Sequence, residues 1–288
     1  MDNQLNKIEF PLYGWIGIVL VVLFWTLNWT LTGLRTDWGF FPLWLGYCLT
    51  VDAIVFKIKG TSLIKRNFKK YFILFLISAP SWWLFEFFNG FTKNWFYEGR
   101  QYFTNFQYII LATISFSTVM PAVFETAELA GTFNWIKKFK SDKAINIKKS
   151  TSLKMFVTGI IMLALIIIFP KYFYYLIWIS LYLIIEPINF FLKTRTLIDH
   201  IINGDWKPVL ALSIGCLICG FFWEMWNIYS YPKWIYHLPF VNFLHVFEMP
   251  LLGYIGYVPF SLELFALFHL VMGILSPKKF NDYIQLTE

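Results

Sequence analysis

The stretch FFWEMWNIYSYPKWIY, residues 221–236, ends a long apolar run and nevertheless contains a carboxylate, Glu224. An earlier stretch, WLFEFFNGFTKNWFY (83–97), repeats this arrangement with Glu86. Windows of about 20 residues without Lys or Arg surround both stretches, and each window is long enough to cross a hydrocarbon core of about 30 Å as a helix. Such windows recur along the chain and predict an all-α polytopic membrane protein.

The composition supports this class, because 58% of the 288 residues are hydrophobic, 22% are aromatic and only 14% are charged. Soluble domains contain roughly 25% charged residues. We expect eight spans, at residues 11–34, 38–56, 71–92, 106–133, 155–170, 172–192, 208–229 and 241–275. Pro250 and Pro259 can kink or break the last one, so seven or nine spans also fit the pattern. The first run is too long for a signal peptide and lacks a cleavage site, so we expect a retained anchor.

The basic residues indicate the orientation. Most of the 24 Lys and Arg residues fall in the N-terminus, three alternate loops and the C-terminal tail. The positive-inside rule therefore predicts that both termini lie in the cytoplasm, with the chain in the plasma (inner) membrane. This bias and anionic headgroups account for the net charge of +7, so the charge does not indicate nucleic-acid binding.

A set of residues recurs at one offset of 138 residues, which a single inserted residue lengthens to 139 for the Trp95 and Tyr97 pairs alone. The matched pairs are Glu86 and Glu224, Asn89 and Asn227, Trp95 and Trp234, Tyr97 and Tyr236, Pro121 and Pro259, and Glu125 and Glu263. Upstream, WLGYCLTVDAIVFKIKGTSLI (44–64) aligns with WISLYLIIEPINFFLKTRTLI (178–198) and pairs Asp52 with Glu186. We expect two tandem four-helix repeats, 1–133 and 154–288, joined by a basic cytoplasmic linker, 134–153. An even number of spans per repeat gives the halves one orientation, related by a pseudo-twofold axis along the membrane normal.

Eight acids fall inside the expected spans, where there is no Lys or Arg: Asp52, Glu86, Glu125, Glu128, Glu186, Glu224, Glu248 and Glu263. A buried ionised carboxylate is costly, so each group must be protonated, hydrogen-bonded, solvated or paired with a bound cation. The helical rise places Glu86, Glu224 and Glu248 toward the outer face and the others deeper, in two layers.

Two spacings predict local contacts of these acids. Asn89 and Asn227 follow their glutamates by three residues, so we expect each amide to hold its neighbouring carboxyl group. Pro121 and Pro259 precede their glutamates by four residues, where a bent helix and a freed carbonyl would form a pocket.

Metal and redox chemistry have weaker support. Cys216 and Cys219 form a C-x-x-C inside an apolar span, which is more typical of inert packing. His245 and Glu248 share a helix face and could bind a metal with Glu224, but a di-iron site needs more such ligands, and we predict no metal site. Phosphate-binding loops and nucleophile elbows are absent from the sequence. The tryptophans also have a simpler interpretation as interfacial anchors.

The order of acid, aromatic residues, proline and glutamate resembles that of the small integral-membrane lycopene cyclases of bacteria, archaea and fungi. The comparable segments are WEMWNIYSYPKWIY (223–236) with PFSLE (259–263), and FEFFNGFTKNWFY (85–97) with PAVFE (121–125). The resemblance implies cyclisation of an isoprenoid or carotenoid end group, with the acid role on Glu263 and Glu125.

That chemistry suits the residues present. It requires a neutral carboxylic acid to protonate an alkene, aromatic faces to stabilise the carbocation, a base to remove a proton, and no cofactor. Burial in an apolar site keeps a carboxylic acid neutral, and Trp and Tyr rings attract cations. The candidate catalytic residues are Glu86, Glu224, Glu125, Glu263 and Glu248. The supporting or substrate-binding candidates are Asn89, Asn227, Trp95, Trp234, Tyr97, Tyr236, Asp52 and Glu186.

Two functions from different classes therefore remain open. An isomerase-like or cyclase-like enzyme would act on a long apolar lipid, and the abundance of bulky aromatic side chains favours it. A proton- or cation-coupled transporter would use the two layers of acids as a path. A membrane scaffold with merely hydrogen-bonded acids is a third interpretation. The expected partners are a lipid or isoprenoid substrate and the bilayer, without nucleic acid.

Overall fold

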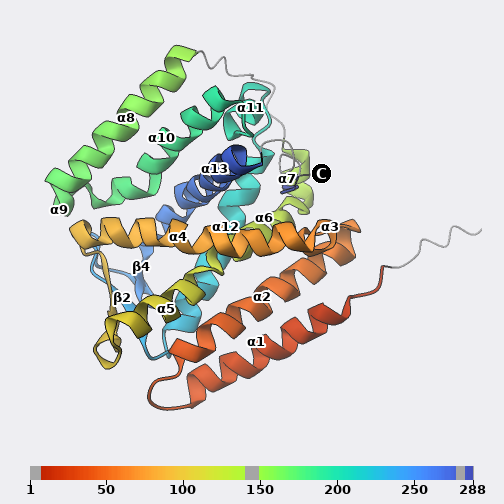
Figure 1. Cartoon of the computed structure of the whole chain (residues 1–288), viewed down its shortest axis with the longest axis vertical. Coiled ribbons are helices and arrows are strands. Elements are labelled where there is room, and N and C mark those ends of the chain that lie inside the picture. The colour runs from red at the N-terminus through yellow and green to blue at the C-terminus, as the bar shows by residue number, and fades with distance from the viewer. Residues whose placement is uncertain (1–7, 140–148, 277–282, 288) are drawn as a thin grey trace, which may run out of the picture.

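The computed structural model describes residues 8–139, 149–276 and 283–287 and is predominantly helical (Figure 1). The first half contains α1 (Leu12–Thr30), α2 (Thr36–Lys59), α3 (Leu63–Arg66), α4 (Phe68–Thr92), β1 (Trp95–Glu98), η1 (Arg100–Tyr102), α5 (Asn105–Phe116), α6 (Val119–Gly131) and α7 (Asn134–Lys138). The second half contains α8 (Lys149–Ile168), α9 (Pro170–Phe173), η2 (Tyr174–Leu176), α10 (Ile177–Leu192), α11 (Leu197–Ile202), α12 (Lys207–Asn227), β2 (Lys233–Tyr236), β3 (His245–Val246), β4 (Met249–Pro250), η3 (Leu251–Gly256) and α13 (Tyr257–Leu275).

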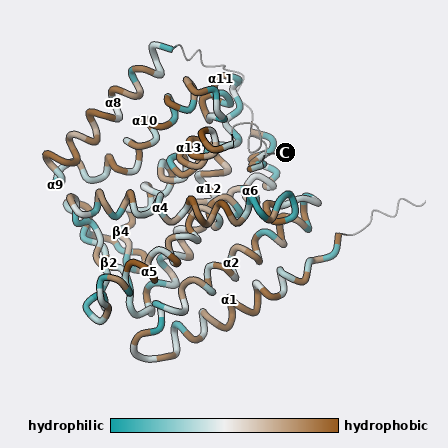
Figure 2. The backbone as a smooth tube through the Cα atoms, viewed as in Figure 1, coloured by the Kyte–Doolittle hydropathy of each residue, from teal (hydrophilic) through white to brown (hydrophobic). Residues whose placement is uncertain are grey.

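Eight segments of the described chain are long and apolar enough to cross a membrane, so the chain is an all-α, multi-pass membrane protein. These segments are Leu12–Thr30, Thr36–Lys59, Phe68–Thr92, Asn105–Gly131, Lys149–Ile168, Pro170–Leu192, Lys207–Asn227 and Leu251–Leu275. Hydrophobic residues colour most of the length of these helices in Figure 2. Their outward faces expose large apolar side chains, among them Leu12, Phe68 and Ile168, as a lipid environment permits.

The fourth span is broken rather than continuous, because α5 ends at Phe116 and α6 begins at Val119. Ser78 of α4 compensates for the break: its hydroxyl donates to the carbonyl of Phe116 (2.6 Å) and accepts from the amide of Met120 (3.0 Å). Pro121 follows, and its missing N–H suits the first turn of the new helix. A polar side chain from a neighbouring helix thus satisfies backbone groups that the break leaves open.

The last expected span, 241–275, is longer than the apolar segment found in the structure, Leu251–Leu275. Residues 241–250 form turns and the two-stranded β3–β4 pair, and the apolar segment begins only at Leu251. Phe240, Leu244 and Phe247 have positive φ angles, which turns the backbone without glycine. Part of the expected linker 134–153, residues 140–148, lies outside the described residues; α8 already begins at Lys149.

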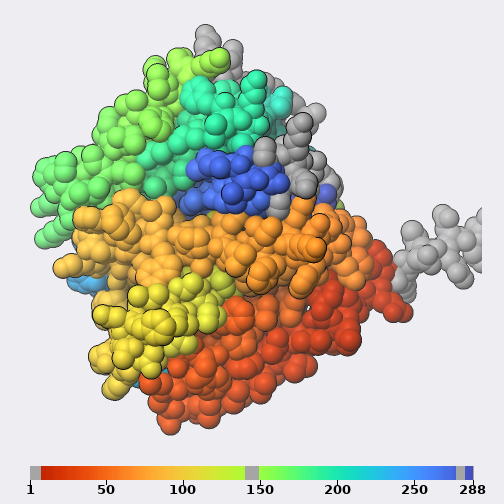
Figure 3. Space-filling view, viewed as in Figure 1, coloured from red at the N-terminus to blue at the C-terminus, as the bar shows by residue number. Residues whose placement is uncertain are grey.

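The helices pack in two pairs at opposite sides of a central group. Helix α1 packs along α2, and α8 packs along α10, while α6 packs against α12 at the centre with α4 and α13 beside them. Figure 3 shows α1 and α2 on one side of the molecule and α8 and α10 on the other. The main core consists of aromatic and aliphatic side chains of the central helices, such as Trp44, Phe85, Phe124 and Phe265.

The two ends of the bundle differ in chemistry. The described chain termini lie at the same end as α3, α7 and α11, where most basic residues are found (Figure 1). At the opposite end, β1 and β2 form an antiparallel ribbon in which Trp95 pairs with Tyr236 and Tyr97 pairs with Trp234. This end is called the ribbon end below. The ribbon joins the segments that follow α4 and α12, and so brings both quoted sequence stretches together.

Candidate functional site

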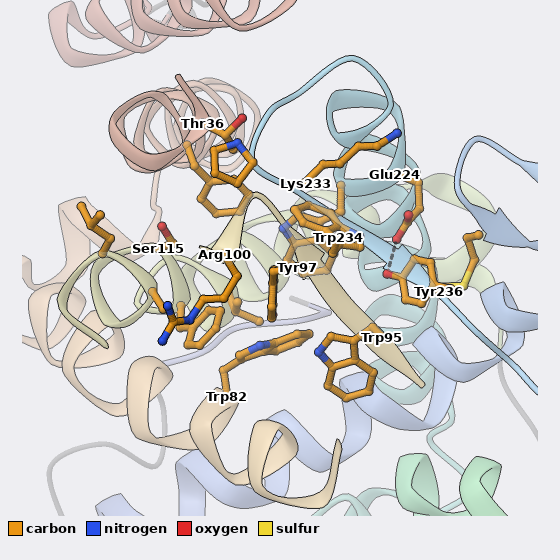
Figure 4. A pocket seen from close by; sticks show the side chains of 18 of the residues that line it. Thr36, Trp82, Trp95, Tyr97, Arg100, Ser115, Glu224, Lys233, Trp234 and Tyr236 are labelled. Carbon is orange, nitrogen blue, oxygen red and sulfur yellow. Dashed lines mark hydrogen bonds between the residues drawn. The ribbon is translucent and has the colours of Figure 1, made fainter. Parts of the chain in front are cut away.

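A cavity of about 180 Å³ lies at the ribbon end, between side chains of both halves (Figure 4). Aromatic rings dominate its walls, including those of Trp82, Trp95, Tyr97, Trp178, Trp223, Trp234, Tyr257 and Phe260. The rings pack on one another: Trp178 stacks on Trp95 and Trp223 stacks on Tyr257. The few polar side chains in the lining are Thr36, Asp37, Arg100, Ser115, Glu224 and Lys233. Such an apolar cavity with a few polar groups is typical of a small-molecule or lipid site.

Glu224, near the C-terminal end of α12, is the fully buried carboxyl group in this lining. Its Oε1 accepts hydrogen bonds from the hydroxyl groups of Tyr236 (2.8 Å) and Tyr257 (2.6 Å). Its Oε2 is enclosed and has no hydrogen-bond partner among the described residues. One oxygen is therefore fixed by two phenols, while the other is enclosed without a partner in a residue that lines an apolar cavity.

Glu86, on α4, is held in a related way. Its Oε1 accepts from the indole Nε1 of Trp82 (3.1 Å), from Nε1 of Trp95 (2.9 Å) and from the hydroxyl of Tyr97 (2.5 Å). Those three donors line the cavity, whereas Glu86 itself lies behind them and is partly exposed. The ribbon residues thus separate Glu86 from the cavity.

Asn89 and Asn227 do not hold their glutamates, so the expectation from the three-residue spacing is wrong. The amide of Asn89 donates to the carbonyl of Trp95 (2.8 Å) and accepts from its N–H (3.2 Å). Asn227 makes the same two bonds to Trp234, at 2.7 and 3.1 Å. Backbone groups leaving a helix lack internal partners, and each asparagine satisfies those of its strand. The asparagines act on the glutamates indirectly, by fixing the strand that carries the tyrosine donor.

The two glutamates differ in one hydrogen-bond donor: Trp82 donates to Glu86, and Tyr257 takes its place at Glu224. The residue matching Trp82 in the second half is Gly220, and a Cβ at Gly220 would meet the ring of Tyr257 at 2.5 Å. The residue matching Tyr257 in the first half is Val119. The missing side chain at position 220 therefore makes room for Tyr257, which supplies the hydrogen bond that Trp82 supplies to Glu86.

Asp52 and Glu186 lie toward the other end of the bundle and bind short helices. Asp52 accepts from the backbone N–H of Ile64 (2.9 Å), and Glu186 accepts from that of Ile198 (2.9 Å). Asp52 also accepts from the hydroxyl groups of Tyr13 and Ser62. Both acids therefore satisfy N-terminal amides of α3 and α11, away from the cavity.

Glu125 and Glu263 are completely buried, and neither lines the cavity. All four of their carboxyl oxygens lack a hydrogen-bond partner within the described part of the chain. Glu128 is placed differently, because it pairs with Arg66 and accepts from the N–H of Gln285 (2.8 Å). The two layers of acids expected from the helical rise are present, but one cavity does not join them.

Glu248 is not part of a membrane span, contrary to expectation. It lies between β3 and β4, is partly exposed, and pairs with Lys233 at 2.5 Å. His245 is exposed and contacts Asn242 instead of sharing a helix face with Glu248. The described residues contain no group of three or more His, Cys, Asp or Glu side chains that could hold a metal ion.

The lining includes five aromatic residues that the sequence did not mark as candidates: Trp82, Trp178, Trp223, Tyr257 and Phe260. Repetition could not reveal Tyr257, because its counterpart is Val119. The cavity tyrosines of the ribbon remain hydrogen-bond donors: burial, and then the neighbouring carboxyl group, raise the pKa of Tyr97 and Tyr236 well above its ordinary value.

The chain matches no protein-family model, no curated protein and no solved structure.

Proposed function

We propose that the chain is a membrane-embedded enzyme that acts on a long apolar lipid, an isoprenoid, by acid–base chemistry at Glu224. The observation that carries the proposal is the placement of this carboxyl group, fully buried in the wall of an aromatic cavity with one oxygen unpartnered among the described residues. A general acid must reach the atom that it protonates, and Glu224 borders the space that a lipid end group would occupy.

The aromatic walls would stabilise the charge that protonation creates. The phenol of Tyr257 donates to Glu224 and its ring stacks on that of Trp223, while Trp234 lines the same cavity (Figure 4). Indole and phenol faces attract a nearby cation by about 0.5–2 kcal/mol each, depending on solvent exposure. A carbocation formed by protonating an alkene would therefore be favoured inside the cavity over the bilayer. The carboxylate that this step leaves on Glu224 would then remove a proton from the carbocation, so the reaction would be an isomerisation or cyclisation without net change in protons, as in the lycopene cyclases that the sequence resembles.

The proposal includes two tandem repeats, at residues 1–133 and 154–288, related by a pseudo-twofold axis. The β1–β2 pairing supports it, because its register matches each ribbon tryptophan with the tyrosine of the other half. Equivalent contacts made by Asn89 and Asn227, and by Asp52 and Glu186, also support it. The protein would lie in the plasma membrane, and by the positive-inside rule the end with α3, α7 and α11 would face the cytoplasm and the cavity would lie near the outer face.

A transporter is the second candidate, and one observation favours it. Glu125 and Glu263 are buried, carry carboxyl oxygens without partners among the described residues, and lie deeper in the bundle than the cavity. Intramembrane carboxyl groups are typical of proton paths. A transporter would move protons or a cation past both layers, and its acids would matter for flux rather than for lipid composition.

The test is expression in a bacterium that accumulates linear polyprenoids, followed by lipid extraction. We expect altered, cyclised or isomerised lipids with the unaltered chain, and their loss with Glu224→Gln, which preserves size but cannot donate the same proton. Glu98→Gln is the matched control, because Glu98 lies on the ribbon and is exposed. An unchanged lipid profile, together with proton or cation flux in vesicles that Glu125→Gln abolishes, would support the transporter instead.

A further inference from the structure

The Glu224 side of the cavity contains two enclosed polar atoms without hydrogen-bond partners in the described chain. One is the carboxyl Oε2 of Glu224, and the other is the indole Nε1 of Trp234. Both residues line the cavity, and their side chains lie beside each other (Figure 4). Buried polar atoms nearly always have a partner, and each exception calls for a physical explanation.

In the first half, the equivalent tryptophan and glutamate, Trp95 and Glu86, are hydrogen-bonded to each other. There the indole of Trp95 donates directly to Glu86 at 2.9 Å, and no atom of either side chain is an enclosed orphan in the described residues. The two halves therefore use the same residue types in different states: Trp95 is hydrogen-bonded to Glu86, whereas the indole of Trp234 lies near Glu224 without the geometry of a hydrogen bond. Tyr236 and Tyr257 already bind Oε1 of Glu224, so the opposite oxygen is left for another group.

A hydroxyl group fits these two atoms best. Its oxygen has two lone pairs, so it can accept both from the indole N–H and from the proton on Oε2 of the neutral Glu224 acid, and one atom satisfies both. A carboxylate or phosphate would bring an uncompensated charge into an apolar cavity, and an ammonium group could not accept from the indole. The remaining walls are aromatic and suit an apolar chain.

We propose that the ligand of this cavity is an isoprenoid alcohol whose hydroxyl binds between Trp234 Nε1 and Glu224 Oε2, so that the second half alone binds the polar end. This inference rests on the proposed function, because it names the substrate class of the same site. It assigns the Glu86 side a supporting role for the ribbon.

Binding to the purified, detergent-solubilised full-length protein tests the proposal, with the shift in thermal unfolding midpoint titrated against three probes of equal length. The probes are farnesol, the hydrocarbon farnesene and farnesylamine. We expect farnesol to bind about tenfold more tightly than farnesene, since a buried hydrogen bond to a carboxyl group is worth about this factor. Equal binding of alcohol and hydrocarbon, or tighter binding of the amine, would overturn the proposal.

Two tryptophan variants test the assignment of the hydroxyl to the second half. Trp234→Phe should remove the preference for farnesol. Trp83→Phe is the matched control and should keep the preference, because Trp83 donates to Thr113 outside the cavity. Glu86→Gln, behind the cavity wall, should also keep the preference, and its loss there would contradict the asymmetry. The comparison of probes on the unaltered protein decides the alcohol preference even where a variant does not fold.

This outcome is separable from that of the lipid-conversion experiment. Conversion in cells that depends on Glu224, combined with equal affinity for farnesol and farnesene, would refute the hydroxyl site and leave the enzymatic proposal intact. A farnesol preference without any lipid conversion would support the hydroxyl site and refute the enzymatic proposal.

Discussion

Aromatic hydroxyl and indole groups, rather than cations, bind the two glutamates at the ribbon end. Glu86 has three such donors and Glu224 has two. A neutral donor stabilises a carboxyl group in an apolar site without adding a second charge that would need desolvation. Such donors fix the orientation of a carboxyl group without adding a second charge to the apolar surroundings.

The asparagine of each half can be tested by its effect on stability. Asn227→Ala removes two hydrogen bonds to the backbone of Trp234. We expect the free energy of unfolding in detergent to fall by about 2–3 kcal/mol, because a buried backbone donor and acceptor are left unsatisfied. Asn203→Ala, in an exposed turn with one bond to Asp199, should change it by less than about 0.5 kcal/mol. Equal effects of the two substitutions would contradict the assigned role.

The glutamates of the site could be found from the sequence because intramembrane acids are rare and repeat at one offset. Their partners could only partly be found. The spacing of Glu86 and Asn89 indicates a shared helix face, but it does not show that backbone groups of the next strand compete for the amide. Tyr257 breaks the repeat and so gave no signal, although the glycine at 220 that accommodates it is visible in the sequence.

At the scale of elements, close packing between helices sets the shape of the cavity. Tyr257 at the start of α13 packs against Gly220 of α12, and this contact directs its hydroxyl to Glu224. On the other side, Ser78 of α4 joins α5 to α6 across the break in the fourth span. Both contacts involve small side chains, which allow membrane helices to approach closely.

Gly220→Ala tests the first of these contacts. The new Cβ would lie 2.5 Å from the Tyr257 ring, so the ring must move away from Glu224. We expect the free energy of unfolding to fall by about 1–3 kcal/mol, as for other overpacked cores. Gly90→Ala in α4 is the control, because nothing lies within 4 Å of its new Cβ. It should be neutral or stabilising by up to about 1 kcal/mol. Gly220→Ala that behaves like Gly90→Ala would show that α13 is not held by this contact.

The span pattern was predictable from hydrophobicity, and all eight expected segments have counterparts among the described helices. Two details were not. Residues 241–250 are largely apolar and contain no glycine, and the positive φ angles of this region fall on Phe240, Leu244 and Phe247 rather than on Asn242. The break at 117–118 depends on Ser78, about 40 residues earlier, and local sequence does not reveal such a partner.

At the scale of the whole molecule, the proposed repeats meet at the ribbon but place their glutamates differently relative to the cavity. The paired strands bring one tryptophan and one tyrosine from each half to a common site. The cavity includes Glu224 in its walls and leaves Glu86 behind them. On the proposed function, the second half would bind the ligand while the first half would support the ribbon.

The proposed orientation can be tested by thiol labelling, because Cys48, Cys216 and Cys219 are all buried. Gln101→Cys, at the ribbon end, should react with a membrane-impermeant maleimide in intact cells, whereas Lys69→Cys should react only after permeabilisation. Both positions are exposed. The unaltered chain is the control for background labelling. The reverse pattern of labelling would place the ribbon end in the cytoplasm.

The central claim is that the cavity beside Glu224 binds an apolar lipid, and photo-crosslinking tests it most directly. The full-length protein in membranes would be irradiated with a diazirine-bearing isoprenoid alcohol, and the labelled peptides would be identified by mass spectrometry. We predict labelling of residues 95–97, 233–236 and 249–260, competed by unlabelled farnesol. Labelling confined to the lipid-facing surfaces of α1 and α8, without competition, would contradict the claim.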